Sequence, residues 1–457
     1  QGFAAQVASQ STHATKAHVL DQLTAVVQQP TAWTDDPIFG ALATAITARD
    51  RHLNPVRPLR DEPVAHQIWG EDGLDGDTLG QLYTACRLPV AVRAAQMPDG
   101  HVGYGLPIGG VLATAGAVVP YAVGVDIACR VKLSLIDLPG KDPEALLAKR
   151  ADRLETALRA QTAFGMGAGF KGSSRRDHPV MEDPAWADLP ERIRRLHSRA
   201  WRQLGSSGSG NHFVEWGIFE LDQTDPSLRA AGDAEAAQLA PGRYLALLSH
   251  SGSRALGAAI AKTFTQIARN ANPLPGNARY LSWLDLNSEA GQQYWSAMNL
   301  AGRYASANHQ LIHEHVLDAA SLSPLAQVEN HHNFAWAEEH DGEPLIVHRK
   351  GATPASDGEL GVIPGTMADP GYLVRGKGDP GSLRSAAHGA GRQMSRSVAK
   401  RSLRQGQVEA YLASKGVKLL AAGLDEAPMA YKDIEAVMSN QVDLVEPLGR
   451  FYPKMAR

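Results

Sequence analysis

Polar side chains that could do chemistry are concentrated in short glycine-rich segments of this sequence. In MPDGHVGYGLPIGG (97–110) the notable residue is Asp99, and in VGVDIACR (123–130) Asp126 and Cys129 lie three residues apart. Glycine allows tight turns and close backbone approaches, so such segments can direct polar side chains toward one place. Four further segments share this texture: GSSGSGNHFVEW (205–216), LLSHSGSRALG (247–257), ENHHNFAW (329–336) and HGAGRQMSR (388–396).

Five side chains from these segments form a candidate set of metal ligands. One carboxylate, one thiolate and three imidazoles can hold one or two divalent ions when turns at strand ends bring them together. None of their spacings is a zinc-finger or HExxH pattern, and each histidine taken alone is better explained as a packed core or surface residue; five such residues in glycine-rich segments favour the metal interpretation for the set. On ligand softness alone, thiolate and imidazole favour zinc. The five are Asp126, Cys129, His212, His250 and His332.

His388 is a candidate nucleophile at the start of HGAGR, and we expect a helix over residues 389–405. Helix N-termini and glycine turns bind phosphate, because their unpaired N–H groups favour negative charge. A neutral histidine there could attack phosphorus and form a phosphoramidate, or it could only hydrogen-bond a phosphate. The residues alone leave both interpretations open. The segment GYGLPIGG is not a GxGxxG fingerprint and no Walker lysine motif is present, so neither standard nucleotide fold is indicated.

Composition and charge narrow the class of protein. The 457 residues are 44% hydrophobic and 20% charged, which is enough to bury a large core. A formal net charge of −3 argues against attachment to nucleic acid by bulk charge, although it is compatible with a local basic groove. Only Cys86 and Cys129 are available, which excludes a disulfide scaffold. No secretory signal is visible, and glycine and proline interrupt the uncharged run 102–125, so we expect a cytoplasmic protein without a membrane span.

The order of the expected elements indicates an α+β fold. Short apolar runs broken by glycine and proline between residues 88 and 135 predict strands and tight turns. Strands and helices do not alternate regularly, so we expect one large α+β domain rather than a doubly wound sheet. We place an N-terminal helical region at 1–85, within the same globule, and a catalytic domain at 86–457. Helices are expected at 14–29, 40–49, 142–161, 184–204, 257–272 and 288–320, and strands at 244–249, 345–347 and 417–420.

Together and in order, these segments resemble the RtcB-type RNA ligases. The resemblance implies a single large domain of mixed sheets and surrounding helices. It implies an enzyme that joins RNA 3′-phosphate or 2′,3′-cyclic phosphate ends to 5′-hydroxyl ends with GTP and Mn²⁺, in RNA repair or tRNA splicing, and it allows for a separate activating protein. It runs from about Leu88 to Glu446 over MPDGHVGYGLPIGG, GVDIAC, GSGNHFVE, SHSGSR, HHNFA, VHRKGA, IPGTM, HGAGRQMSR and AYKDI.

The resemblance also assigns roles to individual residues. It implies two Mn²⁺ ions on the five candidate ligands, with Cys129 bridging both. It implies that His388 becomes guanylylated, giving histidine-linked GMP, that Asp99 is an acidic residue needed beside it, and that Arg392 is a neighbouring cation. The residues implied to hold the guanylate are Asn211, His212, Phe213, Val214, Glu215, His332, Asn333, Pro364, Gly365, Thr366, Met367, Gly371, His388, Gly389, Ala390, Gly391 and Arg392.

The chain departs from the family pattern at three places. The family has glycine on both sides of the bridging cysteine, where this chain has Ala128 and Arg130. Gly371 stands where a small hydroxyl residue is common. The family ends in a Lys-Gly that reaches the guanine, whereas this chain ends in FYPKMAR, with Lys454 as the candidate replacement. Because the metal and nucleophile positions are retained, we expect an active enzyme from a divergent branch.

Two alternatives belong to other functional classes. One is a metal-dependent phosphoesterase that uses water as the nucleophile, with His388 only positioning phosphate. The other is a non-catalytic RNA-binding paralogue. Basic residues are crowded at 192–202 and at 396–404; a charge run is as often a solvated face, but the second run follows His388, which favours phosphate binding there.

Overall fold

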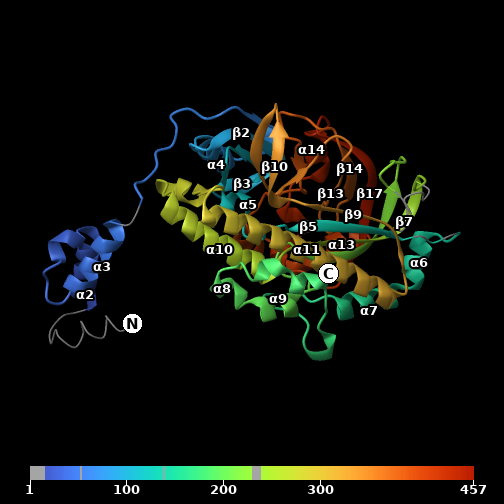
Figure 1. The fold of residues 1–457 in the computed structure, drawn as a ribbon. Helices are drawn as coiled ribbons and strands as arrows, with labels where there is room; N and C mark the ends of the chain where they lie inside the picture. The colour runs from blue at the N-terminus through green and yellow to red at the C-terminus, as the bar shows by residue number, and fades with distance from the viewer. Residues whose placement is uncertain (1–15, 52–53, 137, 139, 229–237) are drawn as a thin grey trace.

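Two large β-sheets with helices packed around them make up the fold, as expected for an α+β protein (Figure 1). The computed structural model describes residues 16–51, 54–136, 138, 140–228 and 238–457. Among these residues, no helix combines the length and apolarity needed to cross a membrane. The uncharged run 102–125 forms strands and a short helix instead.

The larger sheet carries the strand ends that matter for the site. Its strand order over the described residues is β13-β14-β17-β6-β7-β5-β9, with β16 also paired to β17. The Asn330 side chain bonds both backbone groups of Val362, so the two outer strands β9 and β13 approach each other and the sheet curls toward closure. The strands are β5 (Arg130–Ile136), β6 (Phe213–Leu221), β7 (Gly242–Ser251), β9 (Pro324–His331), β13 (Leu360–Ile363), β14 (Gly371–Gly376), β16 (Lys418–Leu419) and β17 (Val445–Ala456).

The smaller sheet meets the larger one at His332. Its order is β1-β2-β3-β11-β10, and β1 pairs with β2 in parallel while the other pairs are antiparallel. Since β9 ends at His331 in one sheet and β10 begins at Asn333 in the other, His332 lies at the junction. The strands are β1 (His66–Ile68), β2 (Ala91–Tyr104), β3 (Leu106–Thr114), β10 (Asn333–His340) and β11 (Glu343–Lys350); β4 (Ala117–Val118) pairs with β8 (Leu284–Asp285), and β12 (Ala352–Pro354) with β15 (Ser385–Ala387).

A long helix supports the larger sheet from below in Figure 1. This helix, α11 (Glu289–Ala320), lies beside α10 (Arg254–Ala271), and Ser288 caps its first turn. His309 and His313, one turn apart, each lie 2.8 Å from the hydroxyl of Ser249 on β7, so both histidines join α11 to the sheet. The other α-helices are α4 (Gly76–Cys86), α5 (Pro120–Val123), α6 (Pro143–Lys149), α7 (Ala151–Gln161), α8 (Glu191–Arg194), α9 (His197–Gln203), α12 (Arg396–Ser402), α13 (Gln405–Ser414) and α14 (Ile434–Ser439).

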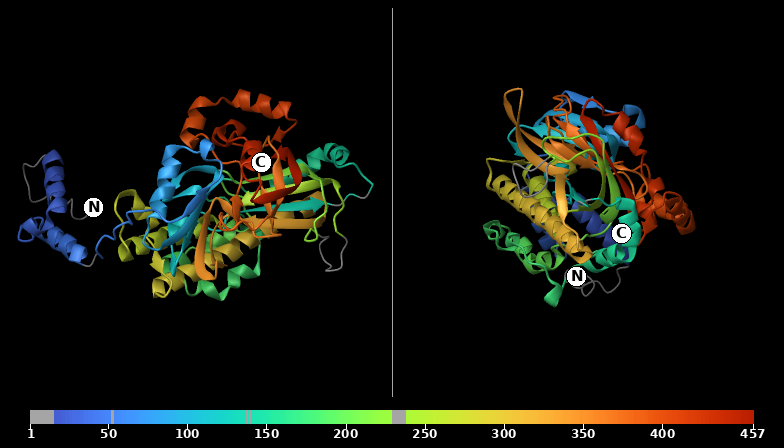
Figure 2. Two further views of the ribbon diagram at one scale, coloured as in Figure 1. Left: turned by 90° about the horizontal axis from the view of Figure 1, so that it is seen from above. Right: turned by 90° about the vertical axis from the view of Figure 1, so that its right-hand side faces the viewer.

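The N-terminal helices form a small core of their own. Helices α2 (Lys16–Gln28) and α3 (Gly40–Arg51) are joined by a 3₁₀ turn and pack through Val26, Phe39 and Ala43. Figures 1 and 2 show this pair set apart from the main body, whereas β1 and α4 pack directly on β2. The domain boundary at residue 85 stays a prediction.

The prediction of a continuous helix at 389–405 is wrong. Residues 388–395 form a loop, and α12 begins only at Arg396. Gly391 adopts a φ of 71°, and a Cβ there would lie 2.1 Å from the carbonyl oxygen of Asp99. The loop therefore packs closely against β2 and does not form a helix. The helix expected at 184–204 is also divided. Pro190 lacks the N–H that a helix interior needs, so α8 begins only after it, and a turn at 195–196 separates α8 from α9.

Candidate active site

A cavity of about 1,100 Å³ lies where the two sheets meet. This volume is at the top of the usual range for small-molecule sites. Its walls come from segments far apart in the sequence, including the edge of the larger sheet, the end of β2 and the loop after β15. The predicted residues that line it are Asp126, Cys129, Asn211, His212, Phe213, Glu215, His250, His332, Asn333, Pro364, Gly365, Thr366, Met367, His388, Gly389, Ala390, Gly391 and Arg392.

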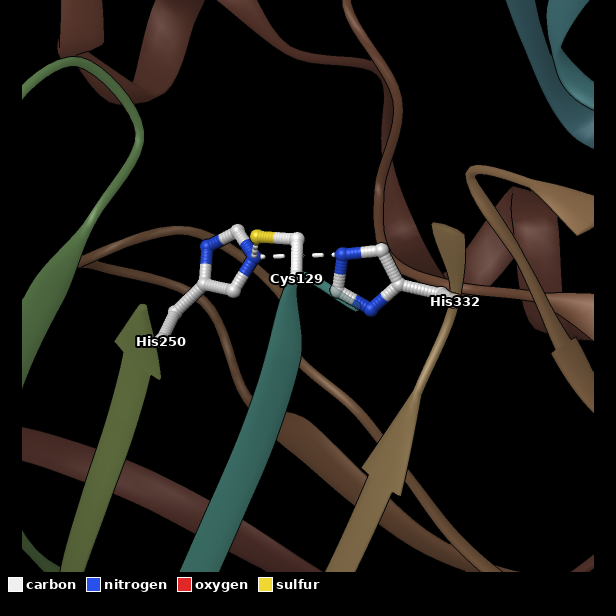
Figure 3. Close-up of side chains that lie close together, drawn as sticks. All are labelled: Cys129, His250 and His332. Carbon is white, nitrogen blue, oxygen red and sulfur yellow. Dashed lines mark hydrogen bonds between the residues drawn. The ribbon is translucent and has the colours of Figure 1, made fainter. Parts of the chain in front are cut away.

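The strand register explains why the predicted metal ligands converge. Cys129 and His212 lie immediately before β5 and β6, His250 lies at the end of β7, and His332 lies immediately after β9. Because β6, β7, β5 and β9 are antiparallel neighbours in this order, the starts of two strands lie beside the ends of the other two. Figure 3 shows Cys129, His250 and His332 directed toward one another from three neighbouring strands.

The ligand atoms form two groups that share one sulfur. Cys129 Sγ lies 3.1 Å from His250 Nε2 and 3.5 Å from His212 Nε2. His250 Nε2 lies 3.2 Å from His332 Nε2, which completes the first group. His212 Nε2 lies 2.9 Å from Asp126 Oδ2, which completes the second. All five residues predicted as ligands are therefore brought together.

Backbone carbonyls orient two of these imidazoles. His212 Nδ1 lies 3.0 Å from the carbonyl of Ser207, and His250 Nδ1 lies 2.7 Å from that of Asn211. A carbonyl only accepts, so each Nδ1 donates its proton, and Nε2 is the nitrogen of each ring that a metal ion can use. In the metal-free protein, Nε2 of His212 instead donates to Asp126. Burial lowers the pKa of His250 to about 3, so the imidazole is neutral near pH 7. His332 Nδ1 is buried with no hydrogen-bond partner among the described residues.

The acidic members of the cluster respond to burial differently. Burial raises the pKa of the Cys129 thiol well above its usual range, and the neighbouring Asp126 raises it further. Burial alone would also raise the pKa of Asp126, but the hydrogen bond and charge of His212 lower it overall. A divalent cation would favour the thiolate and use the lone pairs that face one another, so this donor set fits bound metal.

Arg130 supports the turn that carries Cys129. Ala128 adopts a φ of 57°, an uncommon conformation for a residue with a side chain. The buried Arg130 guanidinium donates to the carbonyl of Ala128 at 3.4 Å and to that of Gly302 in α11 at 3.1 Å. It also pairs with Glu329. These contacts tie the backbone beside the proposed bridging sulfur to α11.

His388 is held by a buried carboxylate. Its Nδ1 lies 2.6 Å from Asp99 Oδ2, and its backbone N–H donates to the same oxygen at 3.2 Å. The Asp99 side chain is fully buried behind His388, while His388 itself lines the cavity. The ring centroids of His388 and His332 are 4.8 Å apart, which places the candidate nucleophile next to the metal-ligand cluster.

Not every residue implied to hold the guanylate reaches the cavity. Val214 is buried in β6 and does not line the cavity. Gly371 does not line it either, and a Cβ at Gly371 would lie 3.3 Å from the Cα of Pro364. Glu215 does line the cavity, and burial raises its pKa to about 8. Lys454 is not among the described residues that line the cavity. From the end of the chain, Ala456 and Arg457 line it.

Sequence reasoning missed an acidic segment that faces the basic run after His388. Glu426 lines the cavity and accepts hydrogen bonds from Arg392 (3.2 Å) and Tyr431, and it pairs with Arg396. Asp425 lies 3.1 Å from the Arg396 guanidinium and 3.4 Å from the Lys400 ammonium. The second basic run is thus partly neutralised. No motif relates residues 396 and 426, so only the fold reveals this pairing.

Comparison with known proteins identifies relatives that share most of the chain. A family model described as "tRNA-splicing ligase RtcB" matches residues 81–456. The chain is 34% identical to the RNA-splicing ligase RtcB of Escherichia coli K12 over 399 residues, which covers 82% of this chain and 92% of that protein. It is 32% identical to the tRNA-splicing ligase RtcB of Thermococcus kodakarensis, covering 81% and 90% respectively. With an RNA-splicing ligase RtcB of Mycobacterium bovis it shares 33% identity, covering 82% and 98%.

Proposed function

The chain belongs to the RtcB family of tRNA-splicing ligases, and from this premise we propose that it joins RNA 3′-phosphate or 2′,3′-cyclic phosphate ends to 5′-hydroxyl ends, using GTP and two Mn²⁺ ions through a histidine–GMP adduct. One observation carries the proposal: His388, held by Asp99, lies 4.8 Å (ring to ring) from His332 in the converged ligand cluster. An RNA repair or splicing role in the cytoplasm, with or without an activating protein, stays a prediction.

The residues that would hold the metals are Asp126, Cys129, His212, His250 and His332, with Cys129 shared. When bound, two divalent ions would offset phosphate charge and lower the pKa of an attacking hydroxyl. The softness of thiolate and imidazole would favour zinc, and Mn²⁺ is proposed from the family resemblance. Metal analysis of the purified protein tests this point independently of activity.

In the first step His388 acts as a nucleophile. The Asp99 carboxylate accepts from Nδ1–H, which leaves the Nε2 lone pair free to attack. A bond forms between Nε2 and the α-phosphorus of GTP, the bond from that phosphorus to the β-phosphate bridge breaks, and pyrophosphate leaves. Asp99 stabilises the cationic imidazole that results.

In the next steps His388 returns to its starting state. An oxygen of the RNA 3′-phosphate attacks the phosphorus of the adduct, the N–P bond breaks, and an RNA–GMP anhydride forms. The 5′-hydroxyl of the second RNA then attacks the RNA 3′-phosphorus, and GMP leaves. The proton of the 5′-hydroxyl passes to solvent. A cyclic phosphate would first be opened by water.

The guanylate is proposed to lie along Asn211–Phe213 with Glu215, along Pro364–Met367 and along the loop 388–392, which line one continuous cavity. Backbone N–H groups of Gly389, Ala390 and Gly391 follow His388 directly and are the nearest candidates to bind phosphate oxygens. Glu215 is the acidic side chain in this wall, and it can accept from or donate to a base edge according to its protonation.

Incubation with labelled GTP and Mn²⁺ tests the proposal. We expect an acid-labile, alkali-stable GMP adduct on the wild-type protein and none on His388→Ala, together with joining of RNA 3′-phosphate and 5′-hydroxyl ends. Absence of the adduct with intact release of phosphate from RNA ends would favour the phosphoesterase alternative. Absence of both would leave the non-catalytic RNA-binding protein.

A further inference from the structure

Three tyrosines from distant parts of the chain meet beside the cavity. Tyr104 lies at the end of β2, Tyr121 in α5, and Tyr280 in the 3₁₀ helix η6 (Gly276–Leu281). The ring centroid of Tyr104 lies 6.4 Å from that of Tyr121 and 5.8 Å from that of Tyr280. The ring centroids of Tyr121 and Tyr280 are 5.6 Å apart. Tyr104 is 64% exposed, so the group, named here the tyrosine platform, presents aromatic surface to solvent.

Two arginines lie against the Tyr280 ring of the platform. The guanidinium carbons of Arg269 and Arg279 lie 4.7 Å and 5.2 Å from the Tyr280 ring centroid. Neither arginine forms an ion pair with an acidic side chain in the part of the chain that is described. Their charges are therefore available to an anionic ligand that stacks on the rings.

The platform is rigidly built. The buried Lys350 ammonium donates to the carbonyls of Tyr104 and Leu106, at 2.6 Å and 2.9 Å, on both sides of the β2–β3 turn. At the turn, Gly105 adopts a φ of 76°, and a Cβ there would lie 3.1 Å from Tyr280 Cβ. The turn thus packs directly on η6. A platform fixed in this way loses little conformational entropy when a ligand stacks on it.

The platform is continuous with the site of His388. Tyr104 lines the same cavity as His388. Lys350, which anchors the turn, is followed by Gly351, and the Cβ position of Gly351 lies 3.1 Å from His388 Cε1. A polymer that reaches the nucleophile along this wall passes Tyr104, the member of the platform that lines the cavity.

We propose that the tyrosine platform binds the unpaired bases of an RNA end and guides that end toward His388. Aromatic side chains beside arginines are the means by which proteins bind single-stranded nucleic acid without sequence preference, because every base has a π face. Arg269 and Arg279 then contact the RNA phosphates. This inference rests on the proposed function for its ligand, since a ligase must admit strand ends that differ in sequence.

The test uses full-length protein without GTP, so that binding is measured apart from chemistry. The probe is a short single-stranded RNA with a 5′-hydroxyl and a 3′-phosphate, carrying 2-aminopurine near one end and, in a second version, near the other. We expect the fluorescence of one version to be quenched on binding. Tyr104→Ala should weaken binding about tenfold and abolish the quenching, whereas Tyr104→Phe, which keeps the ring, should retain both.

Matched variants separate this site from other effects. Tyr83→Ala removes a tyrosine that is 38% exposed on α4 and packs against His66, and it should bind as the wild type does. Arg279→Ala should weaken binding and reduce its salt dependence. Unchanged affinity and quenching in Tyr104→Ala would overturn the proposal, as would a wild-type protein that binds no single-stranded RNA.

The GMP-adduct assay on the wild-type protein distinguishes this failure from failure of the proposed function. An adduct together with quenching that does not depend on Tyr104 would retain the ligase and reject the platform. Quenching that depends on Tyr104 in a protein that forms no adduct would retain the platform and reject the ligase chemistry. If the platform binds a protein and not RNA, the first of these results is expected: the adduct forms, and the quenching does not depend on Tyr104.

Discussion

His388 Nδ1 lies 2.6 Å from Asp99 Oδ2, and this pair joins the loop after β15 to strand β2 of the smaller sheet. The carboxylate has no hydrogen to donate, so the imidazole must donate from Nδ1. The other ring nitrogen, Nε2, is then unprotonated and can act as a nucleophile. In the proposed mechanism Asp99 is therefore a positioning residue that selects the reactive tautomer of His388.

Asp99→Asn should slow formation of the GMP adduct by about a hundredfold or more. The carboxamide can present its N–H₂ group to Nδ1, which would place the imidazole proton on Nε2 and block attack. The measurement is the initial rate of labelled GMP incorporation, with thermal melting as the check on folding. Asp443→Asn is the control, because Asp443 accepts a hydrogen bond from Trp69 away from the cavity. Equal rates for wild type and Asp99→Asn would contradict the assignment.

The two cysteines offer a matched pair for the metal site. Cys129 should act as a ligand, so Co²⁺ added to the metal-free protein should give a thiolate charge-transfer band that Cys129→Ala abolishes. Cys86 is fully buried in an apolar core, where burial raises its thiol pKa to about 12, so Cys86→Ala should leave the band unchanged. A band that persists in Cys129→Ala would exclude the thiolate as a ligand.

The convergence of the candidate metal ligands could be predicted from sequence because each histidine and the cysteine lie within one residue of a strand end. Apolar runs mark such strands, and polar residues at their ends stand out. The fold class followed from the irregular order of the elements. By contrast, the sequence predicts helix for residues 389–395, which form a loop, because nothing local shows that Gly391 must fit against the Asp99 carbonyl.

Contacts between distant segments could not be predicted from one sequence. The pairing of Arg396 with Glu426 joins residues from separate helical segments, and the three tyrosines of the platform are separated by up to 176 positions. Arg130 was recognised only as a departure from the family pattern. Its partner Glu329 lies on β9, and only the register of β5 and β9 brings the two together.

Arg130→Gly should weaken metal binding about tenfold to a hundredfold, because the carbonyl of Ala128 would lose its tie to α11. It should also destabilise the fold by about 3 kcal/mol or more, since Glu329 would lose Arg130, the buried one of its two cationic partners. A Co²⁺ titration measures the first effect and urea unfolding the second.

The double variant Arg130→Gly/Glu329→Gln separates these two effects of Arg130. Removing both charges should restore part of the stability, because no unpaired carboxylate would remain buried, while metal binding should stay weak. If metal affinity returned together with stability, Arg130 would matter only through the fold. If Arg130→Gly bound Co²⁺ as tightly as the wild type, the positioning role would be wrong.

Glu329 should also give the protein a defined acid sensitivity. Burial alone would raise the pKa of this carboxyl, but Arg130 and Lys132 together lower it to about 2 from its usual 4.5. A carboxyl with a lowered native pKa stabilises the fold fully above about pH 4.5, and this contribution is lost as the pH falls toward 2. The shift corresponds to roughly 3 kcal/mol of unfolding free energy.

Glu329→Gln should therefore be less stable than the wild type at pH 7 and should lose less stability between pH 4.5 and pH 2.5. Urea unfolding at a series of pH values measures both effects, because the free energy of unfolding is obtained at each pH. Glu191→Gln is the control, since Glu191 is exposed and pairs with Arg195 on the same helical segment, where such a pair contributes about 0.5 kcal/mol or less. Parallel pH profiles for wild type and Glu329→Gln would show that the ion pairs of Glu329 do not govern acid unfolding, and that other buried carboxylates must.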